Sequence, residues 1–322
     1  MSKQKIVAVG AAIQDVFLSQ SDEFAPVCAN PHECFMRLEL GAKADVNSIS
    51  FSTGGGATNA AVTFARQGIS AVFMGSIGED PAGQAVLQDL DQEGVDTSQV
   101  RVSTKYNTGY SVLLLAPNGE RTILTYRGAS THYHPKDFDL RGMDAGWLYV
   151  SSMAGNMEVL DKLFQQAHSL GTKVCFNPGK GELSQPRKLK GLLEDVDVLL
   201  VNKQEAAMIV SGESSEELAR HLLHYVPVVI ISDGPNGVLA TDGMVIVEAG
   251  MYEDVPVIDR TGAGDAFGSG FLSQWAQGKS LKEAVTFASA NSTSVVTKIG
   301  AKAGILHKGV TLHDMPITER RM

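Results

Sequence analysis

Short apolar runs of strand length alternate with amphipathic stretches of helical length along most of the chain. The strand-like runs cover residues 6–10, 72–77, 148–152, 173–177, 196–202 and 228–232, and the helical stretches cover 60–67, 84–92, 158–170 and 216–225. This alternation predicts an α/β fold in which a mostly parallel sheet carries helices on both faces. Ligands of such sheets bind beyond the carboxyl ends of the strands, so we expect functional residues in the loops there.

Two long segments interrupt this alternation, and both have β character. The second contains a Pro117-Asn118-Gly119 turn between two alternating strands. Insertions of this length usually have a function, so we expect a small β-sheet that covers the site as a lid. An ornamental flap or a dimerisation sheet is the alternative, and an exposed sheet edge predicts a homodimer through the lid. The predicted lid comprises residues 15–52 and 100–126, and the α/β core comprises residues 1–14, 53–99 and 127–322.

Composition excludes several classes of protein. With 322 residues and 43% hydrophobic content, the chain can bury a large core. It has 27 basic and 36 acidic residues, a net charge of −9 and no basic run, so nucleic acid is not an expected partner. We find no stretch for a membrane span or a signal peptide. Three cysteines, odd in number and without Cys-x-x-Cys spacing, indicate free thiols in a reduced compartment, and hence a cytoplasmic protein.

One apolar run near the C-terminal end stops at two glycines and restarts as a helix. Gly262 and Gly264, with Ala263 between them, let several backbone N–H groups point into one small space. The helix adds the positive end of its dipole, so the site suits a phosphoryl group in transfer. Asp265 stands beside it and can take a proton from an attacking hydroxyl. A plainer interpretation is that Thr261 and Asp265 cap the helix while the glycines shape a turn.

A second glycine-rich stretch precedes the helical segment 60–67. Gly55 and Gly56 follow another glycine and allow close approach of the backbone to a ligand. We expect Asn59 to face the pocket, where its amide offers a donor and an acceptor to a pair of polyol hydroxyls. Helix capping explains the same residues equally well.

Several motifs of this kind occur together along the chain. They are Asp15 after the first strand, Gly54-Gly55-x-x-x-Asn59, Gly75-Ser76-Ile77-Gly78-Glu79-Asp80-x-x-Gly83, Asn202-x-x-Glu205 and Asp259-x-Thr261-Gly262-Ala263-Gly264-Asp265. In this order they resemble the ribokinase (PfkB) family of sugar and nucleoside kinases over essentially the full length. The resemblance implies a three-layer α/β/α sandwich with a β lid, and transfer of the γ-phosphoryl group of ATP to a hydroxyl in the presence of Mg²⁺.

The resemblance assigns the chemical step to the most specific of these motifs. Asp265 matches the catalytic base, and the amides of Gly262, Ala263 and Gly264 match an anion hole. We expect the helix N-terminus to lower the pKa of Asp265, which would then be ionised at neutral pH but only weakly basic. Weak basicity suffices because positioning matters more than base strength in a loose phosphoryl-transfer transition state.

The remaining cofactor assignments also come from the resemblance. Asn202 and Glu205 match a motif associated with Mg²⁺ and phosphate, and Glu205 would reach the metal through water. The same pair is a capping box, and both interpretations can hold at once. ATP is expected at the loop after the strand 228–232 and near the predicted helix 281–297. The residues concerned are Ser232, Gly234, Gly237 and Asn291, of which Asn291 matches a position close to the adenine.

A monovalent cation, usually K⁺, is a further implication of the family. It would lie between Asp259 and Thr261 on one side and the loop containing Gly300 on the other. Gly304 departs from this pattern, because members of the family often carry a hydroxyl there.

Asp15 matches the family's sugar-binding aspartate, whose two oxygens accept from adjacent hydroxyls. A buried carboxylate is rarely tolerated without partners, which favours a ligand role. Three departures disfavour ribose: Ile13 replaces an Asn, Gly56 replaces a Lys, and residues 151–153 contain no acid where ribokinases have a Glu. A different hexose or a nucleoside suits a less polar pocket.

Other classes of nucleotide-binding protein lack support. The first strand is not followed by Gly-x-Gly-x-x-Gly, and no Gly-x-x-x-x-Gly-Lys-Ser/Thr is present, which excludes the dinucleotide dehydrogenases and the P-loop proteins. The sequence therefore predicts an ATP-dependent sugar kinase. A nucleoside kinase of the same family and a non-catalytic sugar or nucleotide sensor are the alternatives, and the intact Asp265 argues against the sensor.

Overall fold

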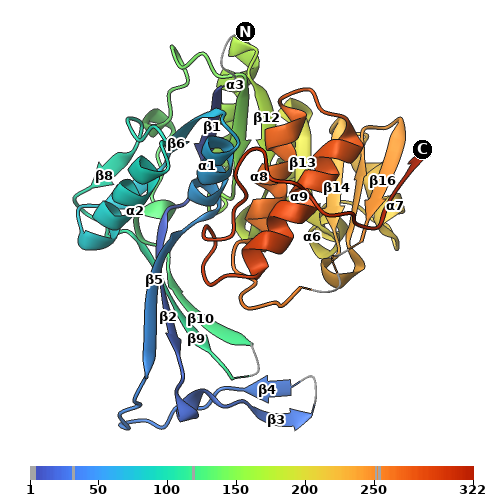
Figure 1. Ribbon diagram of the computed structural model, residues 1–322. Helices are drawn as coiled ribbons and strands as arrows, with labels where there is room; N and C mark the ends of the chain where they lie inside the picture. The colour runs from blue at the N-terminus through green and yellow to red at the C-terminus, as the bar shows by residue number, and fades with distance from the viewer. Residues whose placement is uncertain (1–4, 31–32, 118–119, 251, 253–254) are drawn as a thin grey trace.

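The computed structural model describes residues 5–30, 33–117, 120–250, 252 and 255–322. Its centre is a nine-stranded sheet (Figure 1). Six neighbouring strands are parallel, and three antiparallel strands extend one edge. The predicted α/β fold is confirmed. The order is β6 (Ser70–Met74), β1 (Lys5–Val9), β11 (Trp147–Val150), β12 (Lys173–Phe176), β13 (Val198–Asn202), β14 (Val228–Ser232), β15 (Val238–Thr241), β16 (Val245–Ala249) and β17 (Ile317–Arg321).

Helices cover both faces of this sheet and make three layers. Alternate residues of β1 enter different hydrophobic clusters, because successive side chains of a strand point to opposite faces: Ile6 and Ala8 pack on one side, and Val7 and Val9 on the other. One face carries α1 (Gly56–Arg66), α2 (Pro81–Gln92), α8 (Ala263–Trp275) and α9 (Leu281–Val296), and the other carries α3 (Met157–Leu170), α4 (Lys180–Leu183), α5 (Pro186–Leu192), α6 (Lys203–Ile209) and α7 (Ser215–Leu222). No helix in the described part of the chain is long and apolar enough to cross a membrane.

A separate four-stranded sheet projects from the core and forms the lid (Figure 1). Its order is β10 (Arg121–Tyr126), β9 (Gly109–Leu115), β2 (Ile13–Ser19) and β5 (Ser48–Gly54). The predicted segment 100–126 is divided, because β8 (Arg101–Ser103) pairs with β7 (Ser76–Gly78) outside this sheet. Of the predicted turn at Pro117, residues Asn118 and Gly119 lie outside the described residues.

The two faces of the lid differ in polarity. The strand register places Ser111 and Ser52 opposite Asp15, so these polar side chains share one face near the core. The register also aligns Leu124, Val112, Val16 and Phe51 in one row across the opposite face. Phe51 is 64% exposed and Leu124 is 58% exposed. The outer part of this second face is therefore apolar and uncovered.

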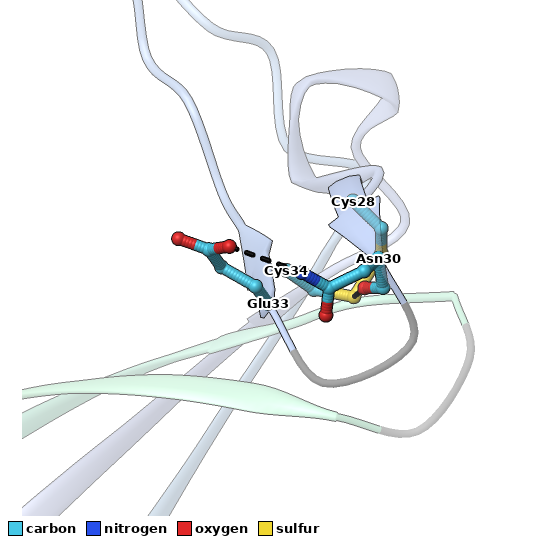
Figure 2. The surroundings of a disulfide bond; sticks show 4 residues. All are labelled: Cys28, Asn30, Glu33 and Cys34. Atoms are coloured by element: carbon cyan, nitrogen blue, oxygen red, sulfur yellow. Dashed lines mark hydrogen bonds between the residues drawn. A yellow bond between two sulfur atoms is a disulfide. The ribbon is translucent and has the colours of Figure 1, made fainter.

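A disulfide at the far end of the lid corrects the prediction of free thiols. The hairpin of β3 (Val27–Asn30) and β4 (Glu33–Phe35) places Cys28 opposite Cys34, with Cα atoms 4.0 Å apart, and the two are bonded (Figure 2). The count of cysteines did not anticipate this pairing across a hairpin. Cys175 is the free cysteine, and it is buried.

Candidate active site

The glycine bend before α8 has the backbone geometry of an anion site. Gly262 is the N-cap residue with a φ of 78°, and a Cβ atom there would lie 2.4 Å from the Cβ of Ala301, so glycine is required for both reasons. No side chain caps this helix, which rules out the interpretation of Thr261 and Asp265 as caps. The first N–H groups of a helix lack intrahelical partners. That of Ala263 makes one long bond, 3.3 Å, to the carbonyl of Arg260.

Asp259 fixes the backbone of this bend by hydrogen bonds. Its Oδ1 accepts hydrogen bonds from the N–H of Thr261 (2.9 Å) and the hydroxyl of Thr261 (2.7 Å), and its Oδ2 accepts from the N–H of Gly300 (3.0 Å). The three residues predicted for a monovalent cation thus come together. The groups that contact Asp259 are N–H and O–H donors rather than cation ligands, and the K⁺ site stays a prediction. At Gly304 a Cβ would lie 2.3 Å from the carbonyl oxygen of Ser294, which leaves no room for the family's hydroxyl.

Asp265 lies in the first turn of α8 and is partly exposed. Its Oδ2 accepts a hydrogen bond of 2.8 Å from Nδ2 of Asn59. Burial of the carboxyl raises the pKa of Asp265, although the Asn59 hydrogen bond acts in the opposite direction. The expected lowering of this pKa is therefore wrong, because desolvation of the carboxyl outweighs the hydrogen bond from Asn59. Asp265 is a better base than we inferred from its place on the helix.

A cleft of about 400 Å³ opens beside Asp265 at the carboxyl ends of the core strands. Its apolar walls include Leu200, Ile230, Val238 and Phe267. Residues without a predicted role also line it, among them Asn177, just after β12, and Arg260, within the glycine motif. Their positions after a strand and inside the motif were the signals that could have found them. Eight predicted site residues meet in this cleft: Asn202, Glu205, Ser232, Gly234, Gly237, Ala263, Gly264 and Asp265.

Asn202 and Glu205 form the capping box that the sequence left open. Asn202 Oδ1 accepts from the N–H of Glu205 at 2.9 Å, and Glu205 Oε2 accepts from the N–H of Asn202 at 2.8 Å. Burial raises the pKa of Glu205. The described residues contain no cluster of three or more acidic, histidine or cysteine side chains that could hold a metal ion. Asn202 and Glu205 both line the cleft, and the capping box uses Oε2 of Glu205, so the predicted reach to Mg²⁺ through water would fall to the other carboxylate oxygen and stays a prediction.

The structure corrects the role predicted for Asn291. This residue is fully buried, its Nδ2 donates to the carbonyl of Ala266 (2.8 Å), and its Oδ1 accepts from the N–H of Leu306 (2.8 Å). Both ends of the amide are used within the protein, so Asn291 ties α9 to α8 and does not line the cleft. Ser292 and Thr293, the next residues of the helix, do line it.

Asp15 leads the acceptor side of the site, where the lid sheet leaves the core. It is 6% exposed and hydrogen-bonds to Ser111, and burial raises its pKa to about 6. The hydrogen bond from Ser111 and the positive charge of Lys302 oppose this rise, and the charges of Asp259 and Asp265 add to it. A Cβ on Gly54 would lie 2.2 Å from Asp15 Oδ2, so the glycine makes room for the carboxylate.

The other predicted acceptor-side residues lie at the start of α1. Gly55 is its N-cap with a φ of 104°, and a Cβ on Gly56 would lie 3.2 Å from Asp265 Oδ1. Asn59 does not present its whole amide to a ligand, because Nδ2 is bound to Asp265. Its Oδ1 is buried and has no hydrogen-bond partner among the described residues. One N–H of the amide thus serves Asp265, while its second N–H and Oδ1 remain, so the predicted interaction with a pair of hydroxyls stays a prediction.

Two buried residues with ionisable side chains, Glu182 and Lys302, were not predicted from the sequence. Glu182 is fully buried and accepts four hydrogen bonds, from the hydroxyl of Ser152 and the N–H groups of Met153, Gly155 and Gly179, each 2.8–2.9 Å long. A carboxylate thus supports the loop 151–153 even though the loop itself contains no acid. Lys302 is buried between Thr53 of β5 and Asp89 of α2 and joins the base of the lid to the core.

Comparisons with known proteins agree with this geometry. Residues 3–308 match the model of the pfkB family carbohydrate kinases. A ribokinase of Haemophilus influenzae is 29% identical over 270 residues, which are 80% of this chain and 86% of that protein. An ATP-dependent ribose-1-phosphate kinase of Halopiger xanaduensis is 29% identical over 271 residues, 82% of this chain and 87% of that protein. A nucleoside kinase structure from Methanocaldococcus jannaschii has the same fold, with a TM-score of 0.77 and 22% identity over 94% of both chains. The chain therefore belongs to the PfkB family of carbohydrate kinases, which transfer a phosphoryl group to an alcohol acceptor.

Proposed function

We propose that this protein transfers the γ-phosphoryl group of ATP to a hydroxyl of a sugar, with Asp265 as the base. The observation that carries the proposal is the position of Asp265 between two half-sites. It lines the nucleotide cleft, and it also lies beside the Gly54–Gly56 segment that holds Asp15. An acceptor hydroxyl near Asp15 and a phosphoryl group at the helix N-terminus would meet at this carboxylate.

The chemical step needs a proton acceptor and a stabilised phosphoryl group. In the proposal, the acceptor oxygen forms a bond to the γ-phosphorus, the bond to ADP breaks, and the acceptor proton passes to Asp265. Burial raises the pKa of Asp265 and so makes it a better base than an exposed aspartate. In the proposal, the N–H groups of Gly262, Ala263 and Gly264 would face the developing charge; of these residues, Ala263 and Gly264 line the cleft. Each such donor is typically worth about 3 kcal/mol.

The cleft suits ATP in shape and in polarity. Its apolar walls accept a base, and the polar loop with Ser232, Gly234 and Gly237 lies at the same carboxyl edge of the sheet as the anion site. Bound Mg²⁺ would neutralise part of the phosphate charge. In our proposal Asn202 and Glu205 hold it through water, because both residues line the cleft.

We favour a sugar over a nucleoside as the acceptor. The two curated relatives described above phosphorylate ribose and ribose 1-phosphate according to their names. Ile13 and Gly56 still remove polar partners that ribokinases use, so the pocket of this protein favours an acceptor other than ribose. A nucleoside is the second candidate, because a nucleoside kinase has the same fold.

We also propose a homodimer through the lid. The strand register places Phe51, Leu124, Ile49, Tyr110 and Tyr126 on one face of the lid sheet, and each of them is exposed. Exposed apolar side chains that gather on one face of a sheet are typical of an interaction surface. A second copy of the same face would cover it by a two-fold axis. We further propose a cytoplasmic location, where ATP is the phosphoryl donor, although the Cys28–Cys34 bond removes the argument from free thiols.

A turnover panel tests the function. Purified protein with Mg²⁺ and ATP is offered pentoses, hexoses, sugar phosphates and nucleosides, and ADP release is followed by a coupled assay. We expect turnover with one sugar class and a loss of about 1,000-fold or more in kcat for Asp265→Asn, because the base is then absent. Calorimetry on the same variant checks that ATP still binds.

Two results would reject the proposal. Binding of an acceptor without turnover for every compound would favour the sensor. Wild-type kcat in Asp265→Asn would remove this residue from the mechanism. Turnover with nucleosides alone would show that the acceptor is a nucleoside rather than a sugar, with the same phosphoryl transfer.

A further inference from the structure

Arg260 is the single positively charged side chain among the described residues that line the cleft. Glu205 and Asp265 line the same cleft and carry carboxylates. In the proposed function, a bound nucleoside triphosphate adds several further negative charges at the N-terminus of α8. Apart from the Mg²⁺ of the proposed function, the amides of the glycine bend and this one guanidinium are the positive groups that would face this charge, so the place of Arg260 matters for the chemistry.

The backbone around Arg260 is fixed, whereas its side chain is free. Asp259 is buried, and its three hydrogen bonds to Thr261 and Gly300 hold the residues on both sides of the bend. Arg260 itself is exposed, and no hydrogen bond or ion pair among the described residues engages its guanidinium. Five other arginines of the protein, by contrast, have carboxylate partners: Arg66, Arg101, Arg141, Arg220 and Arg320.

We propose that Arg260 is a catalytic residue whose guanidinium binds the γ-phosphoryl group of ATP while it is transferred. The inference rests on the proposed function and adds a residue to it. A guanidinium presents two parallel N–H donors that match two phosphate oxygens, and it stays charged at every working pH. Its loop is continuous with Ala263 and Gly264, so the guanidinium and the amides would hold the same phosphoryl group. Arg260 exchanges no atoms in the step, because the proton goes to Asp265 and the leaving group is ADP.

This role predicts a preference that depends on the third phosphate. Binding of ATP and of ADP is measured by calorimetry with Mg²⁺ and without any acceptor. We expect Arg260→Gln to weaken ATP binding about tenfold or more and ADP binding less than about threefold, because only ATP carries the γ-phosphate. Arg260→Lys keeps the charge but loses the fork and is expected to fall between the two. Arg187→Gln is the matched control, since Arg187 is exposed on α5, away from the cleft.

Catalysis supplies the second readout. With an acceptor found by the turnover panel, we expect Arg260→Gln to lower kcat about 100-fold or more and to leave the KM of the acceptor unchanged. Added guanidinium ion is expected to restore part of the activity of Arg260→Ala. Equal losses of ATP and ADP affinity, or a kcat within about threefold of wild type, would overturn the proposal. Because the binding test uses no acceptor, it separates this inference from the proposed function: a protein that phosphorylates nothing still either discriminates ATP from ADP through Arg260 or does not.

Discussion

The nucleotide cleft and the lid are built by different means. In the cleft, strand ends and helix N-termini of the core supply the groups, and bonds such as those of Asp259 fix the backbone that carries them. In the lid, one strand brings Asp15 to the site, and the outer sheet stands away from the core with an exposed apolar face (Figure 1). The cleft proposed for ATP is thus held by the core, while the residues proposed for the acceptor include one carried by the lid, which lies outside the core.

The lid joins the core at an ion pair between the buried Lys302 and the half-buried Asp89. The ammonium of Lys302 lies 2.8 Å from Asp89 Oδ2 and also donates to the hydroxyl of Thr53, the residue before Gly54 on β5. Burial lowers the pKa of Lys302, and the nearby charge of Asp89 opposes this. A mutation in the lid can therefore be expected to act on the acceptor half-site while leaving the cleft unchanged, provided that this junction is kept.

The largest effect is expected at the outer face of the lid. Replacing Phe51 by Lys removes a side chain whose burial is worth about 1.5–3 kcal/mol and, by two-fold symmetry, does so twice in a dimer. The dimer dissociation constant should rise about 100-fold or more, as measured by sedimentation velocity. Leu170→Lys, at an exposed apolar position of the core, is the control. A wild-type protein that sediments as a monomer at micromolar concentration would disprove the dimer.

A smaller effect should separate the two half-sites. Gly54→Ala places a Cβ 2.2 Å from Asp15 Oδ2 and forces the carboxylate aside. We expect kcat/KM for the acceptor to fall about 100-fold while the calorimetric affinity for ATP stays the same, because a displacement of about 1 Å is enough. Gly191→Ala, where a Cβ meets no neighbour, should change neither quantity. A parallel loss of ATP affinity would show that the two regions are not independent.

The smallest effect concerns pH. Burial raises the pKa of Asp15 from 3.8 to about 6, so its carboxylate loses one acceptor oxygen as the pH falls through 6. The acceptor kcat/KM should be about half its plateau at pH 6 and about tenfold lower at pH 5, while ATP affinity follows a different profile. Asp15→Asn should abolish this limb. An acid limb that persists unchanged in the variant would assign the titration to another group.

The raised pKa of Asp15 also lowers the stability of the folded protein at neutral pH. The folded pKa lies above the unfolded value, so the folded state binds the proton more tightly, and stability falls as the pH rises from about 4 to about 6. At neutral pH, Asp15→Asn should therefore raise the free energy of unfolding by about 2 to 3 kcal/mol, and the variant should unfold at a higher temperature. Below pH 4 the gain should vanish.

Local patterns in the sequence were sufficient for the core and the glycine bend. Buried strands such as Val228–Ser232 are apolar up to their last residue, and the positive φ of Gly262 is a local reason for glycine at the bend. The contacts that the sequence did not predict concern partners distant in the chain. The amides of Asn59 and Asn291 bind residues 206 and 25 positions away, and the pKa of Asp265 depends on surroundings that the helix dipole alone does not describe. Side-chain direction and desolvation are tertiary properties, so sequence motifs located these residues without describing their contacts.

The three cysteines of this protein lie outside the candidate active site and offer no reactive thiol in the oxidised state. Cys28 and Cys34 close on each other at the far tip of the lid, and burial raises the pKa of the Cys175 thiol well above its usual range. An alkylating reagent therefore finds no reactive thiolate on the oxidised, folded protein. After gentle reduction the hairpin would be labelled first, which makes it a natural attachment point for a fluorescent reporter of lid position.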